Sequence, residues 1–122
     1  MSTKIEIERH EMVSFFLSKL RNEGGCTLDL ASGVQPTTGY MVSVGKEWRF
    51  SILGHNTVEE FTNVFRSELA KHAHFLGGWE HEGEYYLDVS KNVMDLHEAL
   101  MVAAKNNQKA IFDLNTKEEI ML

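Results

Sequence analysis

Long hydrophobic runs are missing from this 122-residue sequence, in which an apolar run extends over only a few residues, as at Phe15–Leu17. A helix that crosses a bilayer needs roughly 20 consecutive apolar residues, so the sequence predicts no membrane span. The first residues, MSTKIEIERHEM, also lack the apolar middle region and small-residue cleavage site of a secretory signal. We therefore expect a protein of the cytoplasm.

Cysteine and proline each occur once. The single cysteine, Cys26, has no partner for an internal disulfide, and we interpret it as a small strand residue that is kept reduced inside the cell. The single proline, Pro36, lies between Gly33 and Gly39. This composition predicts a turn or an exposed loop around it.

An excess of basic residues is also missing, since 12 lysines and arginines face 18 acids and the net charge is −6. Long-range attraction to a phosphate backbone is therefore not expected, which makes a nucleic-acid partner unlikely. The content of 43% hydrophobic and 25% charged residues is that of an ordinary globular protein. With this length, it predicts one domain over residues 1–122.

Two amphipathic helices are indicated in the first two thirds of the chain. Apolar residues recur at three- and four-residue intervals over about residues 3–22, and Gly24 and Gly25 follow as a stop signal. A second helix is expected to begin after a cap at Asn56 or Thr57, each of which has a glutamate three residues later. We expect Gly77 and Gly78 to end this helix in the same way.

A third helix and a terminal hairpin are predicted near the C-terminus. Asp95 has the position of an N-cap, and Glu98 completes a capping box in front of an alanine-rich apolar stripe. The segments 109–114 and 118–122 flank a short turn and have the pattern of two paired strands.

The remaining segments have the two-residue period of β-strands. They are residues 26–31, 40–44, 48–53 and a hairpin of 79–81 with 84–89. The predicted order is α-β-β-β-α-β-β-α-β-β. Strands joined by short turns favour an α+β fold with a mostly antiparallel sheet that helices cover on one face.

The histidines do not form a convincing catalytic or metal-binding pattern. His72 and His74 would point about 200° apart on a helix, although His81 lies nearby. His97 follows Ser90 and Asp95, yet no G-x-S-x-G motif is present to position a nucleophile. We therefore predict no catalytic residue, no metal ligand and no cofactor, and a non-enzymatic role is favoured.

Aromatic residues give the sharpest expectation for a binding site. Strand alternation places Tyr85 and Tyr86 on opposite faces of a sheet. If helices cover one face, one tyrosine lies on the other face, beside a stretch that also holds Trp79 or Glu80. Aromatic residues on such an uncovered face favour partner docking or self-association. A nucleotide-like ligand could also sit between Trp79 or Tyr86 and the polar residues Ser90 and Asn92. These four residues are the predicted binding residues.

Residues 77–120, GGWEHEGEYYLDVSKNVMDLHEALMVAAKNNQKAIFDLNTKEEI, resemble a segment of small uncharacterised proteins of phages and mobile elements. The amino half, with GCTLDL and TTGYMVSV, is similar to the same group. The resemblance implies an accessory protein that acts in the cytoplasm of the host cell by binding and blocking a host or defence protein.

Three functions follow from these observations. The first is a non-enzymatic phage or mobile-element accessory protein, expected as a homo-oligomer, that binds and blocks a host or defence partner. The second is a protein that binds or sequesters a nucleotide-like small ligand. The third is a metal-assisted hydrolase that uses the histidines and Asp88.

Overall fold

The computed structural model describes the backbone of residues 4–122 and the side chains from residue 8 onward. The helices are α1 (Lys4–Glu23), α2 (His55–Val64), α3 (Arg66–Leu69) and α4 (Leu96–Lys105), and the strands are β1 (Gly25–Leu28), β2 (Tyr40–Phe50), β3 (His74–His81), β4 (Glu84–Val93), β5 (Ala110–Asp113) and β6 (Glu118–Met121). Within this described part, no helix is both long and apolar enough to cross a membrane.

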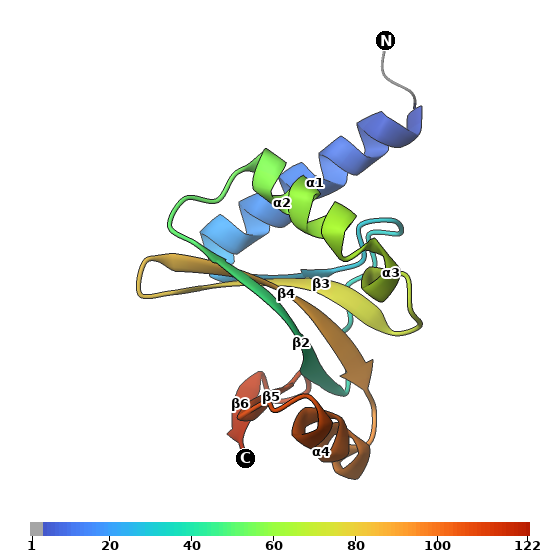
Figure 1. Ribbon diagram of the computed structural model, residues 1–122, viewed down its shortest axis with the longest axis vertical. Coiled ribbons are helices and arrows are strands. Elements are labelled where there is room, and N and C mark those ends of the chain that lie inside the picture. The colour runs from blue at the N-terminus through green and yellow to red at the C-terminus, as the bar shows by residue number, and fades with distance from the viewer. Residues whose placement is uncertain (1–3) are drawn as a thin grey trace.

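The six strands form one sheet in the order β1-β3-β4-β2-β5-β6. Every neighbouring pair is antiparallel. The sheet is curled, with α1 and α2 toward one end of the molecule and α4 toward the other (Figure 1). The α+β class and the antiparallel sheet are thus confirmed.

The strands expected at 40–44 and 48–53 are two limbs of a single long strand, β2. Its pairing with β4 shifts register between Ser43 and Glu47. Gly45 in this interval has a φ of +83°, which an L side chain rarely adopts and which suits the extra residues of a bulge. If the two halves of β2 are counted as separate strands, the elements follow the expected order. The structure adds the short helix α3.

The second glycine pair is not a helix stop, and that prediction was wrong. Helix α2 already ends at Val64, and Gly77 and Gly78 lie inside β3. A Cβ at Gly78 would come within 2.6 Å of the Phe16 ring, so glycine allows α1 to pack close to the sheet. The first pair does end a helix, since Gly24 has a φ of +82°.

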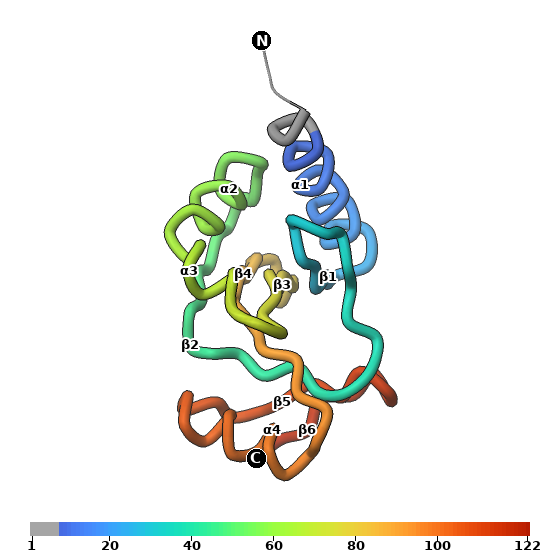
Figure 2. Tube along the Cα trace, turned by 90° about the vertical axis from the view of Figure 1, so that its right-hand side faces the viewer, coloured from blue at the N-terminus to red at the C-terminus, as the bar shows by residue number. Residues whose placement is uncertain are grey.

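Two hydrophobic clusters stabilise the fold, and both use the same face of the sheet. The first lies under α1 and α2 and is centred on the fully buried Phe16 and Phe61. The second lies under α4, where Ala99 and Ala103 pack against Val42 and neighbouring side chains. Because of the curl, α1 and α2 lie at one end of the molecule and α4 with β5 and β6 at the other (Figure 2).

Alternation along β4 shows which face is covered. Leu87 and Val89 belong to the first cluster and Val93 to the second, so these odd-numbered residues share the helix-covered face. The even-numbered residues of β4 point to the opposite face, and none of them belongs to either cluster under the described helices. The predicted one-sided cover of the sheet is therefore present.

Candidate binding site on the open face of the sheet

The two tyrosines separate as alternation predicts. Tyr85 packs against the first core cluster, whereas Tyr86 lies on the open face. There its ring stacks on Trp79, the cross-strand neighbour, with 4.1 Å between ring centroids and 8° between the ring planes. Trp79 remains 39% exposed. An aromatic platform therefore lies on the face that the helices leave uncovered.

Arg49 completes this first row of side chains across the open face. It lies opposite Tyr86 on β2. A hydrogen bond with Tyr86, followed by the charges of Tyr86 and Glu84, raises the pKa of Arg49. Glu84 also accepts a hydrogen bond from Ser51 Oγ at 3.3 Å. The end of the platform is thus bordered by a guanidinium and a carboxylate.

The next row along the strands is Gly77, Asp88 and Glu47. Asp88 is only 8% exposed. A Cβ at Gly77 would overlap the Asp88 carboxylate, which shows that the carboxylate occupies the space left by the missing side chain. Glycine at position 77 therefore has two opposite effects. It lowers the strand propensity of β3, but it makes room for a buried acid.

The environment of Asp88 disfavours its charged form. Burial raises the pKa of Asp88 from 3.8 to about 6; hydrogen bonds from Ser90 and Ser43 lower it, and the charge of Glu47 raises it. Ser90 Oγ donates to Asp88 Oδ2 at 3.2 Å. Burial also raises the pKa of Glu47.

Asp88 has no lysine, arginine or histidine within salt-bridge distance among the described side chains. Burying a carboxylate without a counter-charge costs free energy, and strongly shifted pKa values of this kind cluster at functional sites. Two serine hydroxyls compensate only part of that cost. The arrangement leaves Asp88 able to accept a cationic group.

Ser90 and Asn92 share the open face with Tyr86, but their polar groups are already engaged. Ser90 donates to Asp88, as described above. Asn92 Nδ2 donates to the carbonyl oxygens of Thr38 at 3.0 Å and Tyr40 at 3.4 Å, so it holds the segment that enters β2. Of the four predicted binding residues, the structure brings Trp79 and Tyr86 together and gives Ser90 and Asn92 supporting hydrogen bonds.

Sequence reasoning placed Asp88 on the correct face but missed its importance. Its position between Tyr86 and Ser90 follows from alternation alone. Its burial depends on Gly77 across the strand pair, and Gly77 had been interpreted as a helix stop. A glycine directly opposite an acid in a predicted hairpin is the signal that would have found this pair.

The histidines do not converge. Within the described residues, no group of three histidine, cysteine, aspartate or glutamate side chains is arranged to hold a metal ion. His74 Nδ1 is hydrogen-bonded to the carbonyl oxygen of His72 at 2.8 Å. His97 is exposed on α4, while the Ser90 hydroxyl donates to Asp88. The Ser90 hydroxyl is therefore paired with a carboxylate and not with an imidazole.

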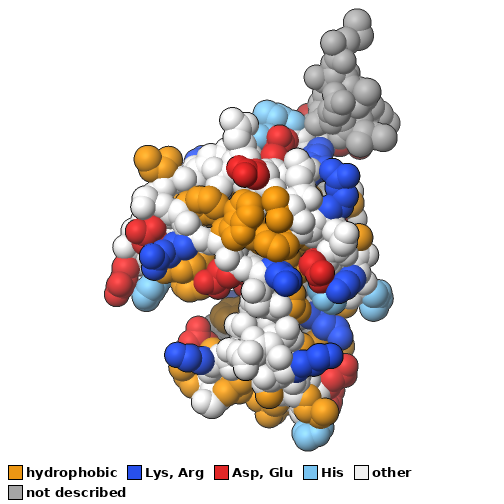
Figure 3. Space-filling model, in the orientation of Figure 1, with side chains coloured by type: hydrophobic (Ala, Val, Ile, Leu, Met, Phe, Trp, Pro, Cys, Tyr) orange, Lys and Arg blue, Asp and Glu red, His pale blue; other side chains and the backbone are white. Residues whose placement is uncertain are grey.

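No protein-family model matches the chain, and no curated protein or solved structure matches it either. The face shown in Figure 3 carries acidic and basic side chains in a mixed pattern, with hydrophobic side chains gathered over α2. On the open face, by contrast, stacked aromatic rings and a buried carboxylate occur together.

Proposed function

We propose that the protein is a non-enzymatic binding protein that captures an arginine side chain of a partner protein on the open face of its sheet. One observation carries the proposal: the buried carboxylate of Asp88, which has no basic group within salt-bridge distance among the described side chains, lies one row from the Trp79–Tyr86 stack. An aromatic surface and a carboxylate are the two groups that a guanidinium recognises best.

The spacing of the two groups suits this ligand. Trp79–Tyr86 and Gly77–Asp88 are successive pairs on the same face, roughly 7 Å apart along the strands. An arginine side chain that lies along the exposed side of Trp79 would direct its guanidinium donors toward the Asp88 carboxylate in the next row. Its planar fork favours arginine over lysine, because only arginine combines stacking with two parallel hydrogen bonds.

The charges around the platform favour a cationic partner. Glu84 and Glu47 lie on the same face as the platform, and Glu82 is exposed at the hairpin turn. Arg49 is the cation in the row of Trp79 and Tyr86. Such a surface attracts a basic segment and accelerates its association. It repels phosphate groups, which counts against the nucleotide-like ligand.

The aromatic stack counts against a nucleotide as well. One face of Trp79 is already covered by Tyr86, so a base cannot insert between the rings without separating them. Asn92, expected to read such a ligand, uses its amide to hold Thr38 and Tyr40. The resemblance to phage proteins supports a partner among host or defence proteins. Capture of an essential arginine would block such a partner.

Peptide binding tests this function directly. Isothermal titration calorimetry compares peptide mixtures that have a fixed central arginine, lysine or citrulline between randomised positions, together with a nucleotide panel. We expect the arginine peptides to bind best and the citrulline peptides to lose binding, because citrulline keeps the shape but not the charge.

Variants locate the binding site. Asp88→Asn and Trp79→Ala should each weaken arginine-peptide binding about tenfold or more, since a hydrogen bond to a charged group contributes roughly 1.5–3 kcal/mol. Met101→Ala, on the exposed side of α4, is the control and should bind like the wild type. Equal binding of citrulline and arginine peptides, or a strong nucleotide response, would refute the proposal. Light scattering on the same samples tests the expected homo-oligomer.

A further inference from the structure

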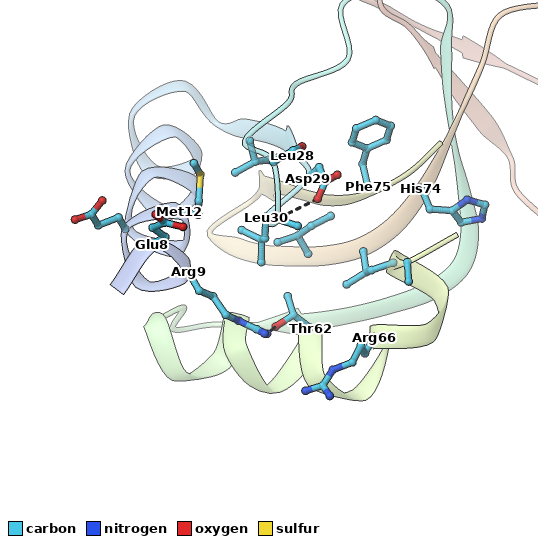
Figure 4. Close-up of a pocket in the computed structure, with 16 residues that line it drawn as sticks. Glu8, Arg9, Met12, Leu28, Asp29, Leu30, Thr62, Arg66, His74 and Phe75 are labelled. Atoms are coloured by element: carbon cyan, nitrogen blue, oxygen red, sulfur yellow. Dashed lines mark hydrogen bonds between the residues drawn. The ribbon is translucent and has the colours of Figure 1, made fainter. Parts of the chain in front are cut away.

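A cavity of about 660 Å³ lies between α1, the α2–α3 segment and the residues that follow β1 (Figure 4). Its volume is within the usual range of small-molecule sites, roughly 300–1,000 Å³. Apolar side chains contribute much of its lining, namely Met12, Leu28, Leu30, Leu69 and Leu76. The cavity is separate from the open-face site, because Leu28 and Leu76 belong to the core under the helices.

Arg9 provides a cationic group at the boundary of α1 and α2. Its Nη2 donates to Thr62 Oγ1 at 2.8 Å and to Asn63 Oδ1 at 3.4 Å. Thr62 is only 4% exposed, and its hydroxyl in turn donates to the carbonyl oxygen of Glu59 at 2.9 Å. Arg9 is therefore held across the gap between the helices by a buried polar residue (Figure 4).

A second guanidinium lies close to the first. Arg66 also lines the cavity, and its Nη2 donates to the same Asn63 Oδ1 at 3.1 Å. In the part of the chain with described side chains, neither Arg9 nor Arg66 is within salt-bridge distance of a carboxylate. Two like charges that share one neutral amide oxygen form a site that an anion would stabilise.

Three carboxylates also belong to the lining of the cavity. Glu8 is exposed on α1, next to Arg9 in the sequence. Asp29 accepts a hydrogen bond from the backbone N–H of Ala31 at 2.9 Å, and Glu11 is exposed on α1. The cavity thus combines an apolar floor with a cationic group at the helix boundary.

We propose that this cavity binds an anionic amphiphile, a linear aliphatic chain that ends in one carboxylate. The aliphatic chain would pack against the leucines and Met12, and the carboxylate would accept hydrogen bonds from Arg9 at the boundary of α1 and α2. Arg66 adds a second positive charge beside this position. This site is independent of the arginine-binding function of the open face, and either can fail without the other.

Dodecanoate below its micelle concentration is the test ligand, with dodecyltrimethylammonium and dodecanol as probes of the same chain length. Calorimetry should show one dodecanoate per chain, and dodecanoate should raise the melting temperature more than either probe. Arg9→Met should weaken dodecanoate binding at least tenfold. Arg49→Met, which removes an exposed arginine from the open face, is the matched control and should leave it unchanged.

Two further variants separate a ligand role of Arg9 from a structural one. Thr62→Val removes the hydrogen bond between the helices but keeps the guanidinium, so dodecanoate binding should persist. Ala70→Phe adds a ring to an exposed position of the lining and should abolish binding while the fold remains. Equal affinity for the ammonium probe, or unchanged affinity in both Arg9→Met and Ala70→Phe, would overturn the proposal.

Discussion

Replacing Asp88 by asparagine should stabilise the protein, by an amount that grows from about pH 4 and is complete above about pH 6. Burial raises the pKa of Asp88 from 3.8 to about 6 in the folded state. Folding therefore takes up a proton between these two pH values, and the free energy of unfolding falls as the pH rises through this window. Two pKa units at about 1.4 kcal/mol each correspond to a loss of up to about 3 kcal/mol at neutral pH.

Asparagine removes this cost because its amide has nearly the same shape and carries no charge. Its side-chain oxygen can still accept the hydrogen bond that Ser90 donates to Asp88. We expect Asp88→Asn to exceed the wild type by about 1–3 kcal/mol at pH 7.5, and to lose this advantage progressively down to pH 4. The lower figure allows for hydrogen bonds that the amide makes less well than the carboxylate.

Urea unfolding followed by circular dichroism at pH 4, 5, 6 and 7.5 measures this difference. Taking the variant minus the wild type at each pH cancels the other titrating groups. Glu118→Gln, at an exposed position of β6, is the control and should give a difference near zero throughout. A pH-independent difference for Asp88→Asn, or destabilisation at pH 7.5, would show that Asp88 is not held as a costly buried charge.

Three further substitutions or reagents test the fold around the site. Gly77→Ala should cost about 2–3 kcal/mol because the new Cβ overlaps the Asp88 carboxylate, and denaturation of the double variant Gly77→Ala/Asp88→Ala should reveal strong coupling between the two positions, whereas additive effects would contradict the contact. Asp95→Ala should lower the melting temperature by removing a cap worth about 1 kcal/mol, since its carboxylate accepts from the Glu98 N–H at 2.9 Å, and an unchanged melting temperature would be inconsistent with this cap. Cys26 should resist a thiol reagent at pH 8 until urea unfolds the chain, because burial raises its pKa to about 11; rapid labelling of the native protein would show that the thiol is accessible.

Most features with local signals were predicted well from the sequence. The cap expected at Asn56 or Thr57 was wrong, because α2 begins at His55 after Gly54. The N-cap of α4 at Asp95 and the glycine stop of α1 at Gly24 depend on residues within one helical turn. The separation of Tyr85 and Tyr86 depends on strand alternation, which is also local. Such features are specified by a few neighbouring residues, so a single sequence is enough to find them.

Features that depend on distant residues were not predicted. The glycines at 77 and 78 have the same local appearance as the pair at 24 and 25, and only their contacts with Asp88 and Phe16 distinguish them. The burial of Asp88 requires the register of β3 against β4. The hydrogen bond from Arg9 to Thr62 joins residues 53 positions apart, so no local sequence pattern indicates the cavity between the helices.

The two long strands β2 and β4 contribute side chains to both hydrophobic clusters. Asp88 and Tyr86 are on β4, between its ends at Glu84 and Val93. A partner bound there would restrain the stretch of backbone that the two ends of the molecule share. Its effect would then extend to slower amide exchange under α4 as well as under α1, at positions that the partner never touches.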